Sequence, residues 1–267
     1  MSETSMGGAD ELRELFKKAE DAKIIGKETG GLLTGHLGHV VIAGAAGAAL
    51  EDIMASEVTL VTVLVDRSSS IGARRLEDAV RAGQSALLDA FVGSKERDSI
   101  LVALWTFATS VSVVHSYVPA KDATRLDGKN YRSSGSTVLY DVWCDALAAN
   151  VAYAQRLRDG GTPSKSVVVV VTDGEDTGSK RTQADCARIS KDLLASESFV
   201  LAFVGVGRDV NFRAVAKGMG VPDGCIAEEK TATPSALRHV FQMVSKSAIR
   251  TSQGMVRPGA AAGFFLP

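Results

Sequence analysis

The fold is decided by the stretch VTLVTVLVD, residues 58–66, an unbroken apolar and β-branched run that ends in an aspartate. A second run, SVVVVVT over residues 166–172, has the same character and is followed by Asp173. Strands that are apolar on both faces are typical of the centre of a parallel sheet, because helices cover both of its sides. These two stretches therefore predict the middle of an α/β sheet.

Outward from these two strands, predicted strands and helices alternate. Strands are predicted at 100–107 and 111–118, and they pair antiparallel because the gap between them is too short for a crossover helix. A further strand is predicted at 199–206 and a short one near Ile226. Helices are predicted at 74–91, at 139–157, at 182–194, after a cap at Asn211, and from Thr233-Pro234 onward. This order predicts a Rossmann-like three-layer α/β/α fold, with a mostly parallel central sheet and one antiparallel edge strand.

Three parts of the chain are expected. Residues 57–250 form the α/β domain, and residues 1–56 form an accessory element with a helix at 9–25 and a Gly-rich segment that is poor helix and strand material. Within that segment the apolar run 40–50 is too short for a bilayer span of roughly 20 residues and is expected to be buried or to dock. The tail 251–267 ends in GFFLP and either tucks onto the domain or is available to a partner.

Composition excludes several function classes. Lys plus Arg number 30 against 31 for Asp plus Glu, so no basic field exists to hold a nucleic acid. The three cysteines, Cys144, Cys186 and Cys225, are odd in number and far apart, which suggests neither a disulfide framework nor a zinc site. The polar N-terminal stretch lacks the apolar core of a secretory signal. We therefore expect a cytoplasmic location, no membrane span and no nucleic-acid partner.

Three polar clusters follow predicted strands or precede a predicted helix. They are DRSSS at 66–70, SSGST at 133–137 and TDGED at 172–176. In an open parallel sheet, ligands gather beyond the carboxyl ends of the strands, near the point where strand order reverses. Hydroxyls and carboxylates are the hard oxygen donors that Mg²⁺ and Mn²⁺ prefer. The clusters therefore predict a divalent cation site.

Together, these clusters resemble the metal-ion-dependent adhesion site of the von Willebrand factor type A (vWA) domain. Asp66, Ser68 and Ser70 match its Asp-x-Ser-x-Ser motif, Thr137 matches its second motif and Asp173 its third, so all its positions are present. The resemblance implies that the three hydroxyls contact Mg²⁺ (or Mn²⁺ or Ca²⁺) directly or through water, while the two aspartates hold coordinated waters or serine hydroxyls. It also implies that a Glu or Asp of a partner protein completes the coordination.

The resemblance covers residues 57–250 and implies a non-enzymatic intracellular vWA module that binds a partner protein, such as an AAA+ ATPase or another multi-component complex. The alternative is a scaffold subunit that binds mainly through residues 1–56 or the FFLP tail, with a vestigial metal site. A metal-dependent phosphohydrolase with Asp66 as nucleophile is less favoured. Such an enzyme needs a second carboxylate two residues on, where Ser68 stands, and a basic group to hold the phosphate.

Overall fold

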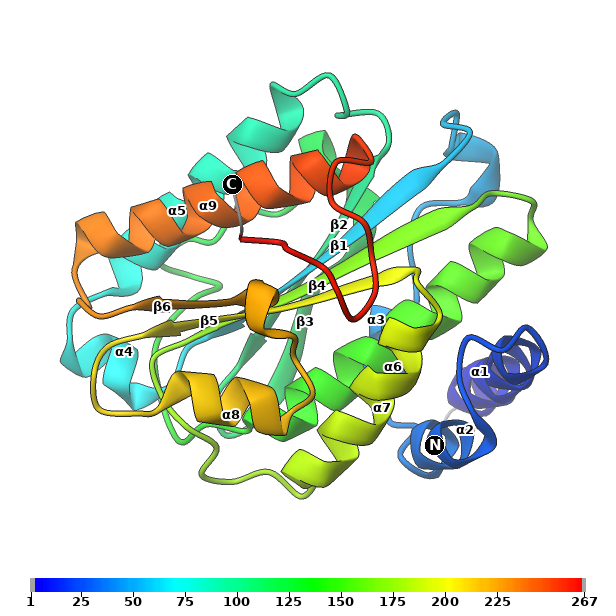
Figure 1. The fold of residues 1–267 in the computed structure, drawn as a ribbon, viewed down its shortest axis with the longest axis horizontal. Helices are drawn as coiled ribbons and strands as arrows, with labels where there is room; N and C mark the ends of the chain where they lie inside the picture. The colour runs from blue at the N-terminus through cyan, green and yellow to red at the C-terminus, as the bar shows by residue number, and fades with distance from the viewer. Residues whose placement is uncertain (1–2, 266–267) are drawn as a thin grey trace.

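The computed structural model describes residues 3–265, whose strands form one six-stranded sheet in the order β3-β2-β1-β4-β5-β6 (Figure 1). Every neighbouring pair is parallel except β2 with β3, which is antiparallel. The predicted sheet, mostly parallel with one antiparallel edge strand, is confirmed. The strands are β1 (Val58–Asp66), β2 (Ile100–Phe107), β3 (Val111–Pro119), β4 (Ser164–Thr172), β5 (Phe199–Val206) and β6 (Ile226–Glu229).

Strand order reverses between β1 and β4. From β1 the chain builds outward to β2 and β3 on one side, and β4 then starts the other side, which ends at β6. All residues of β1 are buried, and Val65 near its end pairs with Val171 of β4. The carboxyl ends of β1 and β4 therefore lie side by side at the topological switch point, where open α/β sheets bind ligands.

Helices cover both faces of the sheet, which confirms the predicted three layers (Figure 1). On one face α5 and α9 pack against each other, and on the other face α6 and α7 pack together, with α8 beside β5 and β6. The helices of this region are α4 (Ser69–Ala73), α5 (Glu77–Val92), α6 (Leu139–Asp159), α7 (Gln183–Ala195), α8 (Phe212–Gly218) and α9 (Pro234–Ser252). Short 3-10 turns occur at η1 (Leu50–Asp52), η2 (Ala120–Asp122) and η3 (Asp223–Cys225).

The N-terminal segment adds an outer layer on the α6 side (Figure 1). It contains α1 (Glu3–Asp21), α2 (Lys27–Gly35) and α3 (His39–Gly44), so the predicted first helix exists but begins and ends earlier in the chain. The apolar side chains Leu12, Leu15 and Phe16 of α1 are buried. Helix α3 packs against both α6 and β3.

The sequence alone leaves the conformation of the Gly-rich segment open, because glycine has a low propensity for helix and strand, and the structure shows that this segment contains two helices, α2 and α3. A Cβ built at Gly44 would lie 2.0 Å from Trp105 Cζ2, and one at Gly47 would lie 2.4 Å from the Tyr153 ring. The backbone therefore packs directly onto two buried aromatic side chains. This contact outweighs a propensity cost of about 1 kcal/mol per glycine.

The tail after α9 folds back onto the sheet domain. Phe264 is fully buried, Gly259 N–H donates to the Phe199 carbonyl at 2.8 Å, and Phe265 N–H donates to the Gly224 carbonyl at 3.1 Å. Leu266 and Pro267, which end the FFLP motif, lie outside the described residues. As far as it is described, the tail is tucked rather than extended.

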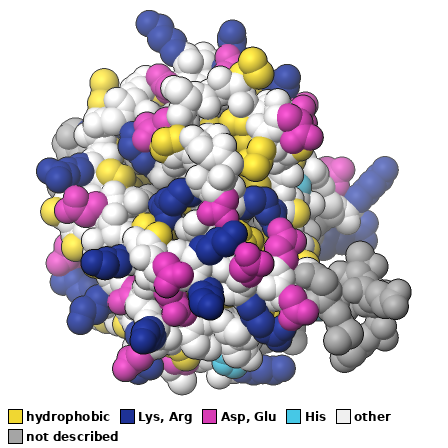
Figure 2. All heavy atoms as spheres, turned by 90° about the vertical axis from the view of Figure 1, so that its right-hand side faces the viewer, with side chains coloured by type: hydrophobic (Ala, Val, Ile, Leu, Met, Phe, Trp, Pro, Cys, Tyr) yellow, Lys and Arg dark blue, Asp and Glu magenta, His cyan; other side chains and the backbone are white. Residues whose placement is uncertain are grey.

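The surface at the end of the sheet away from α4 carries interspersed charges. Figure 2 shows this face, where Lys and Arg side chains alternate with Asp and Glu rather than forming a patch of one sign. The pattern matches the formal net charge of −1. Among residues 3–265, no helix is both long and apolar enough to cross a membrane.

Candidate metal centre

The site is built first around Asp66, at the carboxyl end of β1. Its Oδ1 accepts the Ser68 N–H at 2.7 Å, and its Oδ2 accepts the hydroxyl of Thr172, the last residue of β4, at 2.6 Å. The residue is 1% exposed. Each carboxylate oxygen therefore has a fixed donor, one from its own loop and one from the neighbouring strand.

A chain of side-chain contacts leads from this loop to Asp173. The hydroxyls of Ser68 and Ser70 lie 3.0 Å apart, and the Ser70 hydroxyl donates to Asp173 Oδ1 at 2.6 Å. Since Ser68 N–H already contacts Asp66, four of the five predicted ligands form one hydrogen-bonded group across the β1 and β4 loops.

Thr137, the fifth predicted ligand, lies beside this group but is not hydrogen-bonded to it. A Cβ built at Gly174, the residue after Asp173, would lie 3.5 Å from Thr137 Oγ1. The Thr137 N–H donates to Thr177 Oγ1 at 3.0 Å, and the Thr177 N–H donates to the Thr137 carbonyl at 2.9 Å. The loop before α6 is thus tied to the loop after β4, with the Thr137 hydroxyl facing Gly174.

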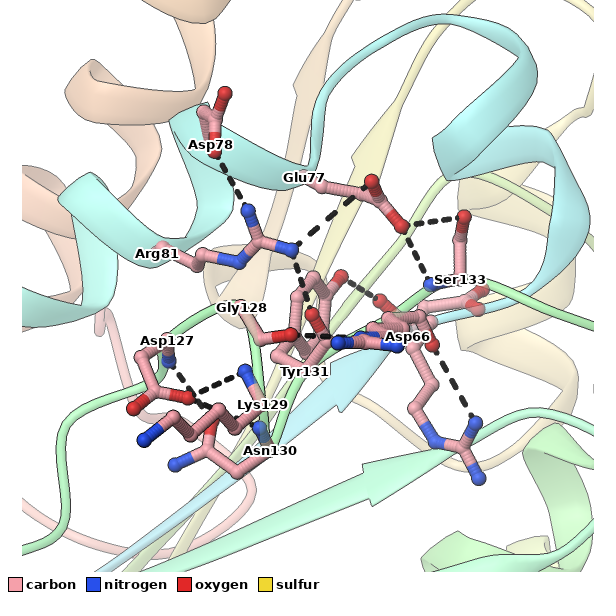
Figure 3. Close-up of polar contacts among 12 residues, drawn as sticks. Asp66, Glu77, Asp78, Arg81, Asp127, Gly128, Lys129, Asn130, Tyr131 and Ser133 are labelled. Atoms are coloured by element: carbon pink, nitrogen blue, oxygen red, sulfur yellow. Dashed lines mark hydrogen bonds and ion pairs between the residues drawn. The ribbon is translucent and has the colours of Figure 1, made fainter.

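Helix α5 holds the loop that leads to Thr137 (Figure 3). Glu77 accepts both the N–H and the hydroxyl of Ser133, at 2.6 and 2.7 Å, and Arg81 donates to the Tyr131 carbonyl at 2.7 Å. The Tyr131 hydroxyl donates to the Asp66 carbonyl at 2.5 Å. These contacts fix the loop against the end of β1. No sequence pattern indicates these contacts, because they join residues at least 50 positions apart.

Gly135 completes the junction between the two loops. Its φ is +77°, a conformation that glycine adopts at no steric cost, and a Cβ there would lie 2.0 Å from Thr109 Oγ1. Its carbonyl accepts both the N–H and the hydroxyl of Ser69, at 3.0 and 2.9 Å. The glycine of the Ser-Gly-Ser-Thr stretch is therefore required where the loop crosses Thr109.

Burial dominates the electrostatics of the two aspartates. It raises the pKa of Asp66 to about 6, against the hydrogen bonds from Thr172 and Ser68, and the charge of Asp173 adds to the rise. Burial also raises the pKa of Asp173, against hydrogen bonds from Ser70 and Arg74. Two adjacent buried carboxylates are costly in their charged form, so the site favours a compensating cation.

One such cation belongs to the protein itself. Arg74 donates through Nη1 to Asp173 Oδ2 at 3.0 Å and through Nη2 to Asp209 Oδ2 at 2.7 Å. The helix predicted from the sequence begins at Arg74. In the structure α5 begins only at Glu77, because Arg75 takes a left-handed conformation with φ of +56°.

The donor set fits a hard divalent cation. It consists of two carboxylates and three hydroxyls, all oxygen, which suits Mg²⁺, Mn²⁺ or Ca²⁺ rather than a thiolate- or imidazole-bound metal. Among the described residues, no group of three or more His, Cys, Asp or Glu side chains is placed to hold a metal. A cation at this site would therefore depend on the hydroxyls of Ser68, Ser70 and Thr137.

Solved structures with a similar fold include a pilus adhesin and a minor pilin. The pilus adhesin SpaC from Lactobacillus rhamnosus GG, in its open conformation, aligns over 73% of this chain at 15% identity with a TM-score of 0.54. The PilB minor pilin from Streptococcus sanguinis aligns over 76% at 13% identity with a TM-score of 0.53. This chain covers 30% of SpaC and 63% of PilB. At these identities the similarity shows the fold alone.

The family follows from the sequence match. A comparison with curated proteins finds no match. The pattern of the von Willebrand factor type A domain, in contrast, matches residues 61–253, which span nearly the whole sheet and its helices. The sheet order and the polar loops beyond β1 and β4 agree with that match. The chain therefore belongs to the von Willebrand factor type A domain family.

Proposed function

We propose that this vWA domain binds a partner protein through a divalent cation held by Asp66, Ser68, Ser70, Thr137 and Asp173. The observation that carries the proposal is the hydrogen-bonded group that joins Asp66 to Asp173 through the Ser68 N–H and the hydroxyls of Ser68 and Ser70. It gathers oxygen donors from two loops at the switch point of the sheet, with Thr137 supplied by a third. A vWA domain is a protein-interaction module, so partner binding is the activity that such a site serves.

The chemistry of the donors favours an acidic partner. Hydroxyls are neutral, so they leave the charge of Mg²⁺ only partly offset, and Mg²⁺ keeps several of its positions as water. A Glu or Asp side chain of the partner replaces one of these waters and gains a charge-assisted contact. Mn²⁺ and Ca²⁺ are the other hard cations that such donors accept.

An enzymatic role is less compatible with the geometry. A phosphohydrolase would use Asp66 as its nucleophile, yet Asp66 is 1% exposed and both of its oxygens accept hydrogen bonds. A nucleophile must reach its substrate. We therefore infer a non-enzymatic module, and phosphate-ester hydrolysis that is abolished by Asp66→Asn would contradict this inference.

A scaffold that works mainly through the chain ends is also less compatible. The aromatic side chains Phe16 of α1 and Phe264 of the tail are buried within the chain, whereas Met54, ahead of β1, and Met255 of the tail are exposed. The aromatic anchors of these segments therefore already have partners inside the molecule, and only the two methionines are open to another protein among the large apolar side chains that the structure describes.

A cytoplasmic location and a partner within a multi-component complex, such as one with an AAA+ ATPase, are part of the proposal. The three cysteines are free thiols, which suits a reducing compartment. SpaC is a pilus adhesin and PilB a minor pilin, so a location at the cell surface is the competing possibility. Recovery of the protein in the membrane-free cytosolic fraction, rather than on the cell surface, is the expected result of fractionation.

The cation is tested by calorimetric titration of Mg²⁺ and Mn²⁺ into the wild type and into a variant with Asp66→Ala and Ser68→Ala. We expect the double variant to lose at least about a thousandfold in affinity, because it loses a buried charge and a direct ligand. Ser69→Ala is the matched control: among the described residues its hydroxyl contacts the Gly135 carbonyl, and the Ser69 N–H keeps that contact in the variant. It should stay within about threefold of the wild type.

Partner binding is tested with the same variants. In a pull-down, the wild type and Ser69→Ala should retain the same protein in Mg²⁺ and release it in EDTA, whereas the double variant should not capture it. Equal capture by the double variant, or in EDTA, would contradict the proposed function.

A further inference from the structure

Arg74 lies between the two loops that follow β4 and β5. Its guanidinium contacts Asp173 Oδ2 at 3.0 Å and Asp209 Oδ2 at 2.7 Å. The Asp173 side chain is fully buried, whereas the Asp209 side chain is 79% exposed, so the two ends of the contact lie in different environments. One arginine thus joins a buried carboxylate of the candidate site to an exposed one outside it.

Arg74 occupies a carboxylate oxygen of Asp173 that would otherwise be free to contact a metal ion or a water bound to it. Asp173 Oδ1 accepts the Ser70 hydroxyl at 2.6 Å and Oδ2 accepts Arg74, so both oxygens have a donor. A divalent cation and a guanidinium repel each other, and each gains from the same carboxylate. Metal and Arg74 therefore compete for Asp173.

The surrounding backbone is shaped to hold this arginine. Gly207, in the loop after β5, has a φ of +123°, and a Cβ there would lie 3.2 Å from Arg74 Nη1. Any larger residue at this position would be strained and would crowd the guanidinium. On the other side, the Arg74 N–H donates to the Ser70 carbonyl at 3.0 Å, which places the arginine one helical turn from a predicted ligand.

We propose that Arg74 is an internal competitor that sets the metal affinity of the site. The guanidinium of Arg74 offsets the charge of Asp173 and so lowers the affinity of the site for a divalent cation. When a cation binds and displaces Arg74 from Asp173, Arg74 keeps its ion pair with Asp209. Metal occupancy is thereby coupled to the contact between the loops after β4 and β5. This inference rests on the proposed function, because it requires that the site bind a cation.

The test is a calorimetric titration of Mn²⁺ into the wild type, Arg74→Gln and Arg74→Met, with Arg75→Gln as control. Arg75 is the next residue, is exposed, carries the same charge, and has no side-chain hydrogen bond or ion pair among the described residues. We expect both Arg74 variants to bind Mn²⁺ at least about tenfold more tightly than the wild type. Arg75→Gln should stay within about twofold of the wild type, since it changes net charge alone.

Thermal unfolding gives a second measure that does not depend on partner binding. Without metal, the Arg74 variants should melt below the wild type, because buried Asp173 has lost its counter-charge. Saturating Mn²⁺ should raise their Tm by more than it raises that of the wild type. Arg74→Met, the second neutral variant, keeps the aliphatic part of the side chain. If Arg74→Gln does not fold, the Mn²⁺ affinity and the Tm are measured on Arg74→Met instead.

The outcomes separate this inference from the proposed function. If the wild type, both Arg74 variants and Arg75→Gln all bound Mn²⁺ with the same affinity, the competitor role of Arg74 would be overturned, whereas the proposed metal site would be supported. Absence of Mn²⁺ binding in every variant would overturn both. Tight binding by the Arg74 variants alone, with weak binding by the wild type and Arg75→Gln, would support both.

Discussion

Strand β1 carries two buried polar clusters, four residues apart, that differ in how they are satisfied. At Thr62, the hydroxyl contacts Tyr117 Oη at 2.6 Å, Asn150 Nδ2 donates to the same Oη at 2.8 Å, and the Ser166 hydroxyl donates to Asn150 Oδ1 at 2.7 Å. This cluster is neutral and its members satisfy one another. The cluster at Asp66 is charged, and the protein offsets it only partly. The difference teaches that a buried polar cluster whose members satisfy one another stabilises the fold, whereas a charged cluster that is only partly offset is where we propose that a ligand binds.

The Thr62 cluster also connects the N-terminal segment to the sheet. Tyr117 stacks on Tyr153 with ring centroids 4.7 Å apart and planes within 5°. The Tyr153 hydroxyl donates to the Ala48 carbonyl at 3.0 Å, and the Ala48 N–H donates to the Tyr117 carbonyl at 2.8 Å. Damage to this cluster should therefore loosen the accessory segment and leave the cation site intact.

The largest expected effect follows from Asn150→Ala. The change removes the amide that joins Tyr117 to Ser166 and leaves buried polar groups unpaired, so we expect the free energy of unfolding to fall by about 3 kcal/mol. Tyr117→Phe, which keeps the stacked ring and removes one hydroxyl, should cost about 1 kcal/mol. Chemical denaturation measures both. If Asn150→Ala also weakened Mn²⁺ binding by more than about threefold, the two clusters would not be independent.

An effect of opposite sign, and of similar size at most, is expected from Asp66→Asn in EDTA. Burial raises the pKa of Asp66 from 3.8 to about 6, so folding favours the protonated carboxyl. This stabilisation is complete below about pH 4 and is lost as the pH rises through about 6. Without metal, the neutral variant should therefore be more stable than the wild type by up to about 3 kcal/mol at pH 7.5 and nearly equal to it near pH 4.

Urea denaturation in EDTA at the two pH values measures this difference, and Asp209→Asn is the control because its exposed carboxylate should show no such gain. A less stable Asp66→Asn at pH 7.5 would mean that the carboxylate is structural, like the Thr62 cluster, and that the comparison between the two clusters is wrong.

The smallest effect is expected from Ser133→Ala, which removes a hydroxyl that donates to Glu77 at 2.7 Å but keeps the backbone contact. The loop that carries Thr137 loses part of its attachment to α5, and Mn²⁺ affinity should fall about threefold, or somewhat under 1 kcal/mol. Calorimetry with Ser110→Ala, a serine in an exposed turn, provides the matched comparison. Equal affinities in the two variants would show that α5 does not position the loop.

The sequence predicted those strands whose own residues are enough to specify them. The bounds of β1, β2 and β5 agree with the expected 58–66, 100–107 and 199–206, since long β-branched runs specify buried strands. The polar residues at the ends of β1 and β4 were expected to converge because parallel strands end at one edge, and Asp66 and Asp173 are indeed joined through two serines. Cation binding at that edge stays a prediction.

Elements that depend on distant residues were not predictable in this way. Helix α3 ends in a Gly-rich segment where Gly44 and Gly47 pack on Trp105 and Tyr153, which lie far along the chain. The role of Arg74 depends on Gly207, in a loop more than 130 positions away. Neither contact leaves a pattern in the residues around it. In the Gly-rich segment, tertiary packing outweighed the low helix propensity of glycine, and at Arg74 the side-chain partner lies in a distant loop.

Residues 47 and 48 have one more consequence, for strand β3 at the border of the sheet. Gly47 forms a parallel bridge with Tyr117, so a short piece of the N-terminal segment occupies part of the open side of β3. A bare border strand is a template on which other copies can pair and aggregate. We therefore expect a shortened chain that began at β1 to expose this side of β3, together with the α6 surface that α1 and α3 cover, and to associate with other copies more readily.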